Sequence, residues 1–172
     1  MGSEDRDELI EWLKANGPRE WHCVATSWNW DMYHEPLHWI LDQPNCDRGT
    51  AVTLLWLADP TWYLQWSSRE EVMIAQPYNI EGFDMVTKIV KNWERGFYRD
   101  ANFSTDDDPH LGQGPDGTYQ SAEANLDKAK LPWIIPQELR QSYNGEKLDR
   151  GGYKSNQGLP PGFDEENWRA PW

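Results

Sequence analysis

The sequence predicts a mainly α-helical protein: a small multi-helix domain with a tryptophan-rich core and an irregular C-terminal arm. Apolar residues recur at the three- and four-residue spacing of helix faces through residues 1–100. Turns are predicted between these segments at residue pairs that contain Pro or Gly. The chain also holds 12 Trp in 172 residues. Because each buried aromatic ring removes about 150–250 Å² from water, these rings can compensate for an apolar content of 38%.

The first two predicted helices are separated by Asn16-Gly17. Asp5 is expected to cap the first helix, with Glu8 completing a capping box, and its buried stripe consists of Leu9, Ile10 and Leu13. Pro18 suits the first position of the second helix. The inward face of that helix carries four apolar residues at helical spacing: Trp21, Val24, Ala25 and Trp28.

Two further helices are predicted to begin at Pro36 and after Asp47, which serves as the N-cap of the second of them. The first should end near Gln43, because that residue precedes a proline. Their inward-facing residues are Leu37, Ile40 and Leu41 in the first, and Ala51, Leu54, Leu55 and Ala58 in the second.

Residues 61–66 are predicted to form a short helical turn, whereas residues 67–79 fit either a strand or a helix. A long helix is expected from about Ile80 to Tyr98. One of its faces carries Val86, Ile89, Val90, Trp93 and Phe97. Gly96 weakens its last turn.

The composition changes after residue 100. Residues 101–172 hold 8 of the 13 Gly and 7 of the 12 Pro, and they include the apolar run Leu131–Pro136 and a possible short helix ending near Tyr143. We therefore expect residues 1–100 to form the helical domain and residues 101–172 to form an extension that packs on it. Aromatic residues would hold this arm: Tyr153, Phe163, Trp168 and Trp172.

The net charge of −13 limits the classes of partner. Such a chain repels polyphosphate, which argues against nucleic acid, and it attracts a basic protein. No apolar run is long enough for a membrane span, and the acidic N-terminus does not resemble a signal peptide. Two cysteines make no disulfide framework, so we expect a soluble, cytoplasmic protein.

His34-Glu35-Pro36-Leu37-His38 has the letters of the zinc-protease motif H-E-x-x-H. In that motif both histidines must lie on one helix face. Pro36 should begin a helix rather than lie inside one, which places His34 outside it. We therefore predict no zinc protease.

The sequence also disfavours a metal site of irregular spacing and a cysteine nucleophile. A metal site could draw on five residues, but their spacing fits no zinc-binding pattern: His22, Cys23, His34, His38 and Cys46. Neighbouring residues such as His22 and Cys23 point about 100° apart on a helix, so they make a poor nucleophile pair. Cys46 lies near a helix N-terminus, where its pKa could be lowered, although a structural turn cysteine is favoured. We predict no catalytic residue, metal or cofactor.

Residues 20–66 resemble the DUF4274 family of bacterial domains. The matching stretches are Trp21–Ala25, Trp28–Asp31, Pro36–Leu41 and, most specifically, Gln43–Ala51 with Leu54-Leu55-Trp56. The resemblance implies a small helical domain. It also suggests a protein encoded beside a toxin gene as an immunity factor, and it assigns no catalytic residue.

These observations favour a protein-binding module, an immunity-type inhibitor of a basic toxin or effector. Trp residues could act as anchors and carboxylates could pair with Lys and Arg. The expected partner-binding residues are Trp30, Asp31, His34, Glu35 and His38 together with the acidic run Asp106, Asp107 and Asp108. Two alternatives stay open. One is a hydrolase or metal-dependent enzyme with a site near His22, Asp31, His34 and His38, and the other is a structural subunit of an assembly.

Overall fold

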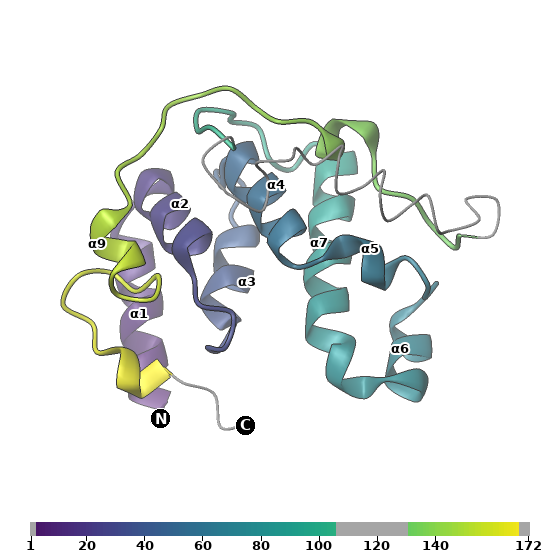
Figure 1. The fold of residues 1–172 in the computed structure, drawn as a ribbon, viewed down its shortest axis with the longest axis horizontal. Coiled ribbons are helices and arrows are strands. Elements are labelled where there is room, and N and C mark those ends of the chain that lie inside the picture. The colour runs from purple at the N-terminus through teal and green to yellow at the C-terminus, as the bar shows by residue number, and fades with distance from the viewer. Residues whose placement is uncertain (1–2, 106–130, 169–172) are drawn as a thin grey trace.

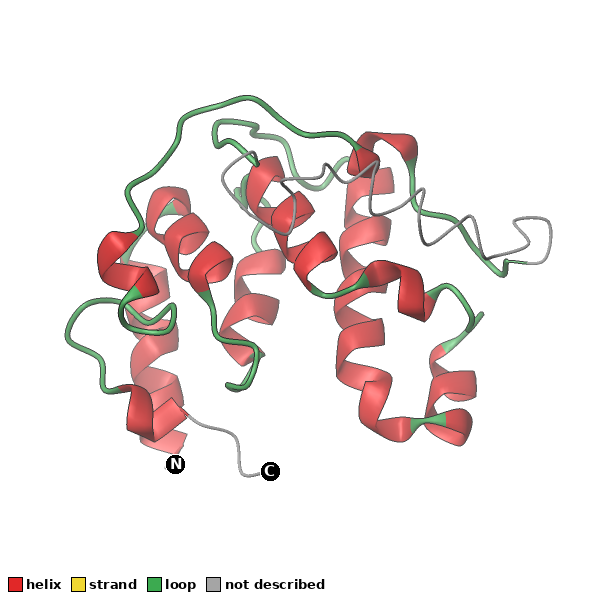
Figure 2. Cartoon of the chain, in the orientation of Figure 1, coloured by secondary structure: helices red, strands yellow, loops and turns green. Residues whose placement is uncertain are grey.

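A computed structural model describes residues 3–105 and 131–168. The predicted mainly α-helical fold is confirmed: within the described ranges the ribbon consists of helices joined by loops (Figure 2). The pairing of Phe103 with Glu146 is an isolated bridge rather than part of a sheet. None of the helices in these ranges has the length and apolar character needed to cross a membrane.

Helices α1 (Ser3–Ala15) and α2 (Pro18–Ser27) meet at the predicted Asn16-Gly17 turn (Figure 1). The Gly17 N–H donates to the Glu20 carboxylate at 3.1 Å, which satisfies one free donor at the start of α2. The indole N–H of Trp21 donates to the Leu13 carbonyl oxygen at 2.8 Å and ties the two helices together. The predicted cap at Asp5 is wrong, because α1 begins two residues earlier and Asp5 lies inside it.

Helices α3 (Glu35–Leu41) and α4 (Arg48–Leu57) follow the predicted signals. Pro36 lies in the first turn of α3. Asp47 is the N-cap of α4, and its carboxylate accepts the Gly49 N–H at 2.8 Å. Helix α4 is buried on nearly every side, which explains why its sequence is apolar all round rather than striped.

The ambiguous segment after residue 66 is helical. It contains α6 (Arg69–Ala75) and the 3₁₀ helix η1 (Pro77–Asn79), between the short α5 (Pro60–Tyr63) and the long α7 (Ile80–Glu94). Ser68 caps α6 by accepting the Glu71 N–H at 3.2 Å. Helix α7 ends earlier than predicted, because Gly96 adopts a left-handed φ of 69° that stops a helix.

The main core joins α1–α4 and α7 to residues from the C-terminal arm. Four buried indoles contribute to it: Trp21, Trp28, Trp56 and Trp168. A smaller second core lies under α5 and α6 and consists of Trp66, Val72 and Phe83. The tryptophan-rich character of the core thus rests on particular rings, while the aliphatic side chains of α4 and α7 fill the space between them.

The arm crosses the helices from α7 to α1 (Figure 1). It contains η3 (Gln137–Arg140), α9 (Gly151–Lys154) and η4 (Glu165–Trp168). Polar contacts hold it in place: the Trp56 indole N–H donates to the Leu139 carbonyl at 2.7 Å, and the buried Arg150 guanidinium donates to the Thr26 carbonyl at 2.9 Å. Trp168 is 1% exposed, and its ring meets that of Trp28 edge to face at 6.0 Å.

Candidate functional site

The two histidines of the H-E-x-x-H stretch have different positions relative to α3. His34 is its N-cap residue, outside the helix as Pro36 predicted, and His38 lies within it. The Nε2–H of His34 donates to the Trp30 carbonyl oxygen at 2.9 Å, and the rings of the two residues contact each other at 5.1 Å. Nδ1 of His34 lies 3.5 Å from the Glu81 carboxylate of α7.

This geometry sets the protonation preference of His34. Burial lowers the pKa of His34, but the Glu81 carboxylate and the Trp30 carbonyl more than compensate, so the net pKa is raised. The reason is local: in the neutral ring the proton sits on Nε2, so a lone pair on Nδ1 faces the carboxylate. Protonation replaces that repulsion with an ion pair.

His38 has the opposite preference. Its Nδ1 lies 3.2 Å from the Lys88 ammonium, which can only donate, so the imidazole must accept in its neutral form. Lys88 also pairs with Asp42 at 3.0 Å. Burial, followed by the charge of Lys88, lowers the pKa of His38. Both histidines therefore contact α7, and together they join α3 to that helix.

The other expected partner-binding residues are spread around this junction. Glu35 is exposed and pairs with Arg6 of α1 at 2.7 Å, and the Arg6 guanidinium lies over the Tyr33 ring at 3.9 Å. Asp31 is exposed in the turn after α2. The structure thus brings Trp30, Asp31, His34, Glu35 and His38 to one region. The remaining three, Asp106, Asp107 and Asp108, fall outside the described residues.

Within the described ranges, no group of three or more His, Cys, Asp or Glu side chains is arranged to hold a metal ion. The five residues of the looser pattern do not converge on one point within the described ranges. His22 is buried and its Nδ1 lies 2.8 Å from the Thr50 hydroxyl, whereas His34 and His38 belong to the α3–α7 junction. The H-E-x-x-H spacing therefore has a structural explanation in helix capping and helix–helix contacts.

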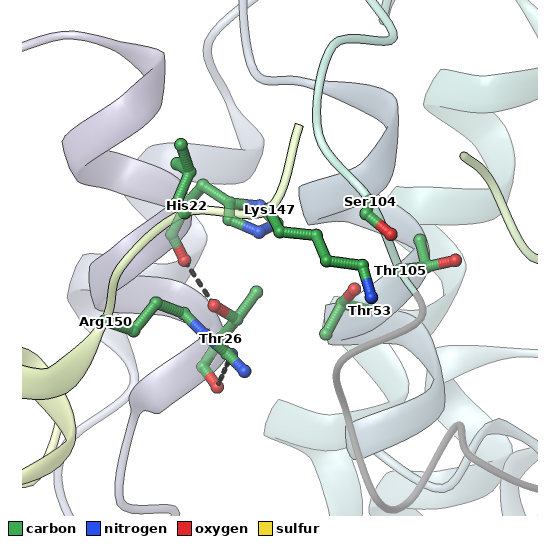
Figure 3. A pocket seen from close by; sticks show the side chains of 8 residues that line it. His22, Thr26, Thr53, Ser104, Thr105, Lys147 and Arg150 are labelled. Carbon is green, nitrogen blue, oxygen red and sulfur yellow. Dashed lines mark hydrogen bonds between the residues drawn. The ribbon is translucent and has the colours of Figure 1, made fainter. Parts of the chain in front are cut away.

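A small polar cavity lies where α2, α4 and the arm meet (Figure 3). Its volume is about 10 Å³. That space holds about one water molecule and no organic substrate. Its lining is mostly hydroxyl and basic side chains: His22, Thr26, Thr53, Ser104, Thr105, Lys147 and Arg150. At this volume the cavity is part of the contact between the arm and helices α2 and α4.

Both cysteines are buried free thiols. Burial raises the pKa of Cys46, and the neighbouring Asp47 raises it further. The possibility that the helix N-terminus lowers this pKa is therefore overturned, because the loss of water outweighs the helix field. Burial also raises the pKa of Cys23. Burial therefore disfavours the thiolate form at both positions.

Residues 47–50, within the stretch Gln43–Ala51 singled out in the sequence, form a latch, by which we mean the contacts of residues 47–50 with α2 and residues 98–103. The Asp47 carboxylate accepts backbone N–H groups from Asn102 at 2.6 Å and Phe103 at 3.3 Å. Arg48 donates through Nε to the Tyr98 carbonyl at 2.8 Å. Gly49 lies against the Phe103 carbonyl, where a Cβ atom would overlap it. The latch thus holds the segment after α7 in place.

The structure reveals an exposed apolar surface that the sequence interpretation missed. In the described part of the chain, five large apolar side chains are exposed: Trp62 (47%), Met73 (46%), Ile74 (87%), Tyr78 (80%) and Ile134 (59%). We call these five residues the apolar surface. They belong to α5, α6, η1 and the start of the arm, at the end of the molecule opposite α1 (Figure 1). Trp30, one of the expected partner-binding residues, is half-buried rather than exposed, and its indole nitrogen is buried.

A sequence signal for this surface did exist. Val72, Met73 and Ile74 are consecutive, and neighbouring residues on a helix point about 100° apart. Once that segment is helical, at most part of the run can face inward. Only Val72 of the three is buried. The uncertainty between strand and helix for residues 67–79 therefore concealed the surface.

A groove of about 710 Å³ adjoins this surface between α6, α7 and residues 133–134. Its apolar floor is formed by Phe83, Val90, Trp133 and Ile134. Two charged residues of the lining, Arg69 of α6 and Asp84 of α7, are joined by a contact of Arg69 Nε with both carboxylate oxygens at 3.0 and 3.1 Å. The Trp133 indole N–H donates to the Trp66 carbonyl at 2.9 Å and fixes the opposite wall.

Comparison with known families gives a match over part of the chain. Residues 16–94 match the model of a family described as a domain of unknown function (DUF4274), which confirms the expected resemblance. The match spans α2 to α7 and includes the latch residues 47–50, most of the apolar surface and the α7 wall of the groove. No curated protein and no solved structure matches the chain.

Proposed function

Proceeding from this family match, we propose that the protein is a protein-binding module of the cytoplasm that acts as an immunity-type inhibitor of a basic toxin or effector. The observation that supports the proposal most strongly is the gathering of all five exposed large apolar side chains of the described residues at one end of the molecule. Single exposed apolar residues are ordinary on protein surfaces, whereas a group of them marks an interaction site.

The charge of the chain supports a basic partner. A net charge of −13 produces a negative potential that raises the encounter rate with a positively charged protein. Aromatic and large apolar side chains then contribute most of the binding free energy, as Trp62 and Tyr78 could here. In this proposal the carboxylates act mainly on association, and the apolar surface acts mainly on dissociation.

The residues that join α3 to α7 form a second candidate contact region. Trp30, Asp31 and Glu35 lie there with the two histidines, and Glu35 and Asp31 are exposed. Replacing Asp31 and Glu35 with Lys would slow association with a basic partner and flatten its dependence on salt. Unchanged association kinetics would remove this region from the interface.

The proposal is tested by co-purification from the cells in which the protein is native. A tagged wild-type chain should retain a basic protein that is released by high salt, and co-expression should relieve the toxicity of that protein. The Ile74→Glu, Tyr78→Glu variant should retain at least tenfold less of it. The matched control is Lys14→Glu at an exposed position of α1, which makes the same charge change of −2 away from the apolar surface. Equal retention by the Ile74→Glu, Tyr78→Glu variant, or the absence of a specific partner, would refute the proposal.

A further inference from the structure

We propose that the groove between α6 and α7 binds one amphipathic helix with basic flanks, supplied by the partner. This inference rests on the proposed function and specifies which element of the partner binds and where. The groove offers apolar floor residues below a rim that carries charge, and each part restricts the occupant.

The length of the groove indicates a helix. Its α7 wall is lined from Phe83 through Thr87 and Val90 to Glu94, a spacing of three or four residues along one helix face. The step of eleven residues from Phe83 to Glu94 corresponds to about 16 Å along the axis of α7, or three helical turns. A helix laid along this wall would place side chains at positions i, i+3 or i+4, and i+7 against the floor.

An extended peptide is a poorer occupant. Peptides that bind as strands gain most of their affinity from backbone hydrogen bonds to a free sheet edge. The walls of the groove are α6, α7 and a loop, and the backbone N–H and C=O groups of helix interiors are already paired. A helix satisfies its own backbone and needs only side-chain contacts from the groove.

The rim favours positive charge on the occupant. Residues 59–94 contain six acids and three bases, a net charge of −3. The groove lining holds three acids and two bases, a net charge of −1: Arg69 is paired with Asp84, while Glu70, Lys91 and Glu94 are exposed. Lys or Arg on the flanks of the bound helix would pair with these glutamates. A second copy of this chain would bring its own net charge of −13 and be repelled.

The groove is continuous with the apolar surface. Ile134 belongs to both. On α6, Glu70 lines the groove, and Met73 and Ile74 follow it at i+3 and i+4 on the same helix face. A helix seated in the groove would therefore leave Ile74 and Tyr78 to contact other parts of the partner.

The test uses a fluorescein-labelled peptide of Leu and Lys, about 14 residues or four helical turns long, with Leu on one face. Fluorescence anisotropy should show binding to the wild-type chain. It should show at least tenfold weaker binding by a scrambled peptide of the same composition and by a peptide with Glu in place of Lys. Ile134→Glu should weaken binding at least tenfold, and Glu70→Lys, Glu94→Lys should weaken it and flatten its salt dependence.

The matched control is Glu4→Lys, Asp7→Lys, which makes the same charge change on exposed positions of α1. If this control and the groove variants lose peptide binding equally, the peptide is attracted by the net charge of the protein alone, and the inference is overturned. Equal binding of the scrambled peptide, or no binding, would overturn it as well. If the native partner is lost with Ile74→Glu, Tyr78→Glu but retained by Ile134→Glu and by Glu70→Lys, Glu94→Lys, the proposed function stands and the groove inference fails. If the peptide binds as expected while no native partner is found, the proposed function fails alone.

Discussion

The Asp47 carboxylate accepts the backbone N–H of Asn102, with the two atoms 2.6 Å apart across 55 residues of sequence. The same side chain caps α4 and accepts a third N–H from Phe103. One buried acid therefore fixes both the start of α4 and the path of the chain after α7. Burial raises the pKa of Asp47, and the three N–H donors oppose that effect.

Asp47→Asn should lower the free energy of unfolding by about 1–3 kcal/mol. The amide oxygen can still accept from Gly49, but the amide nitrogen would face the donor of Asn102 and leave it unpaired. Urea denaturation measures the change. Asp7→Asn, on an exposed position of α1, should have an effect below about 0.5 kcal/mol. Equal stability of the two variants would show that the latch contributes little.

Gly158 and Gly162 require glycine for different reasons: backbone conformation alone at Gly162, and both conformation and lack of space at Gly158. Both have positive φ, 94° and 100°, but a Cβ at Gly158 would lie 2.5 Å from Trp28 Cα, whereas a Cβ at Gly162 meets nothing within 4 Å. Gly162→Ala should cost about 1–2 kcal/mol from backbone strain alone. Gly158→Ala should cost about 1–3 kcal/mol more, because the arm must move away from α2. Equal unfolding free energies would contradict this close approach.

His34 and His38 should respond to pH with opposite signs. The pKa of His34 is raised in the fold, so its contribution to stability is full below the ordinary value of 6.5 and is lost as pH rises through the folded-state pKa. The pKa of His38 is lowered, so the unfolded chain binds more protons just below pH 6.5 and stability falls as the pH decreases through that window.

Unfolding free energies measured between pH 5 and 8 test this pair. The stability lost in His34→Gln should be larger at the acidic end, and the stability lost in His38→Gln should be smaller there. Each variant serves as the control for the other, because both replace an imidazole at the α3–α7 junction by the same amide. A common sign for the two pH trends would show that their contacts with Glu81 and Lys88 do not set their protonation.

Trp56→Phe should loosen the arm. The substitution removes the indole N–H that donates to the Leu139 carbonyl, and the oxygen left behind is buried beside η3. We expect a loss of about 1–3 kcal/mol and faster hydrogen exchange in residues 135–140. Trp62→Phe, at a ring that is 47% exposed, should leave stability within about 0.5 kcal/mol of wild type. Unchanged exchange in residues 135–140 would contradict the predicted role of Trp56.

Local signals were sufficient to predict the helices up to residue 60. Proline at Pro18 and Pro36 and the cap at Asp47 act within one helical turn, so the sequence specifies them without tertiary information. The start of α1 was misplaced because Asp5 fits a cap and an early helix position equally well. The end of α7 required the φ of Gly96, which a sequence does not give directly.

The candidate site was less predictable, because it depends on contacts between distant segments. Nothing near Asp47 in the sequence identifies Asn102 as its partner, and nothing near Phe83 places Trp133 across a groove. Cys46 illustrates the same limit: its position at a helix start suggested a lowered pKa, whereas tertiary burial raises it.

The edge-to-face contact of Trp28 with Trp168 has a consequence for biosynthesis. The two residues are 140 positions apart. At translation rates of about 5–20 residues per second, α2 therefore emerges from the ribosome roughly 7–28 s before the ring that covers it is made. During that interval the nascent chain carries the Trp28 indole without the ring that covers it in the finished protein.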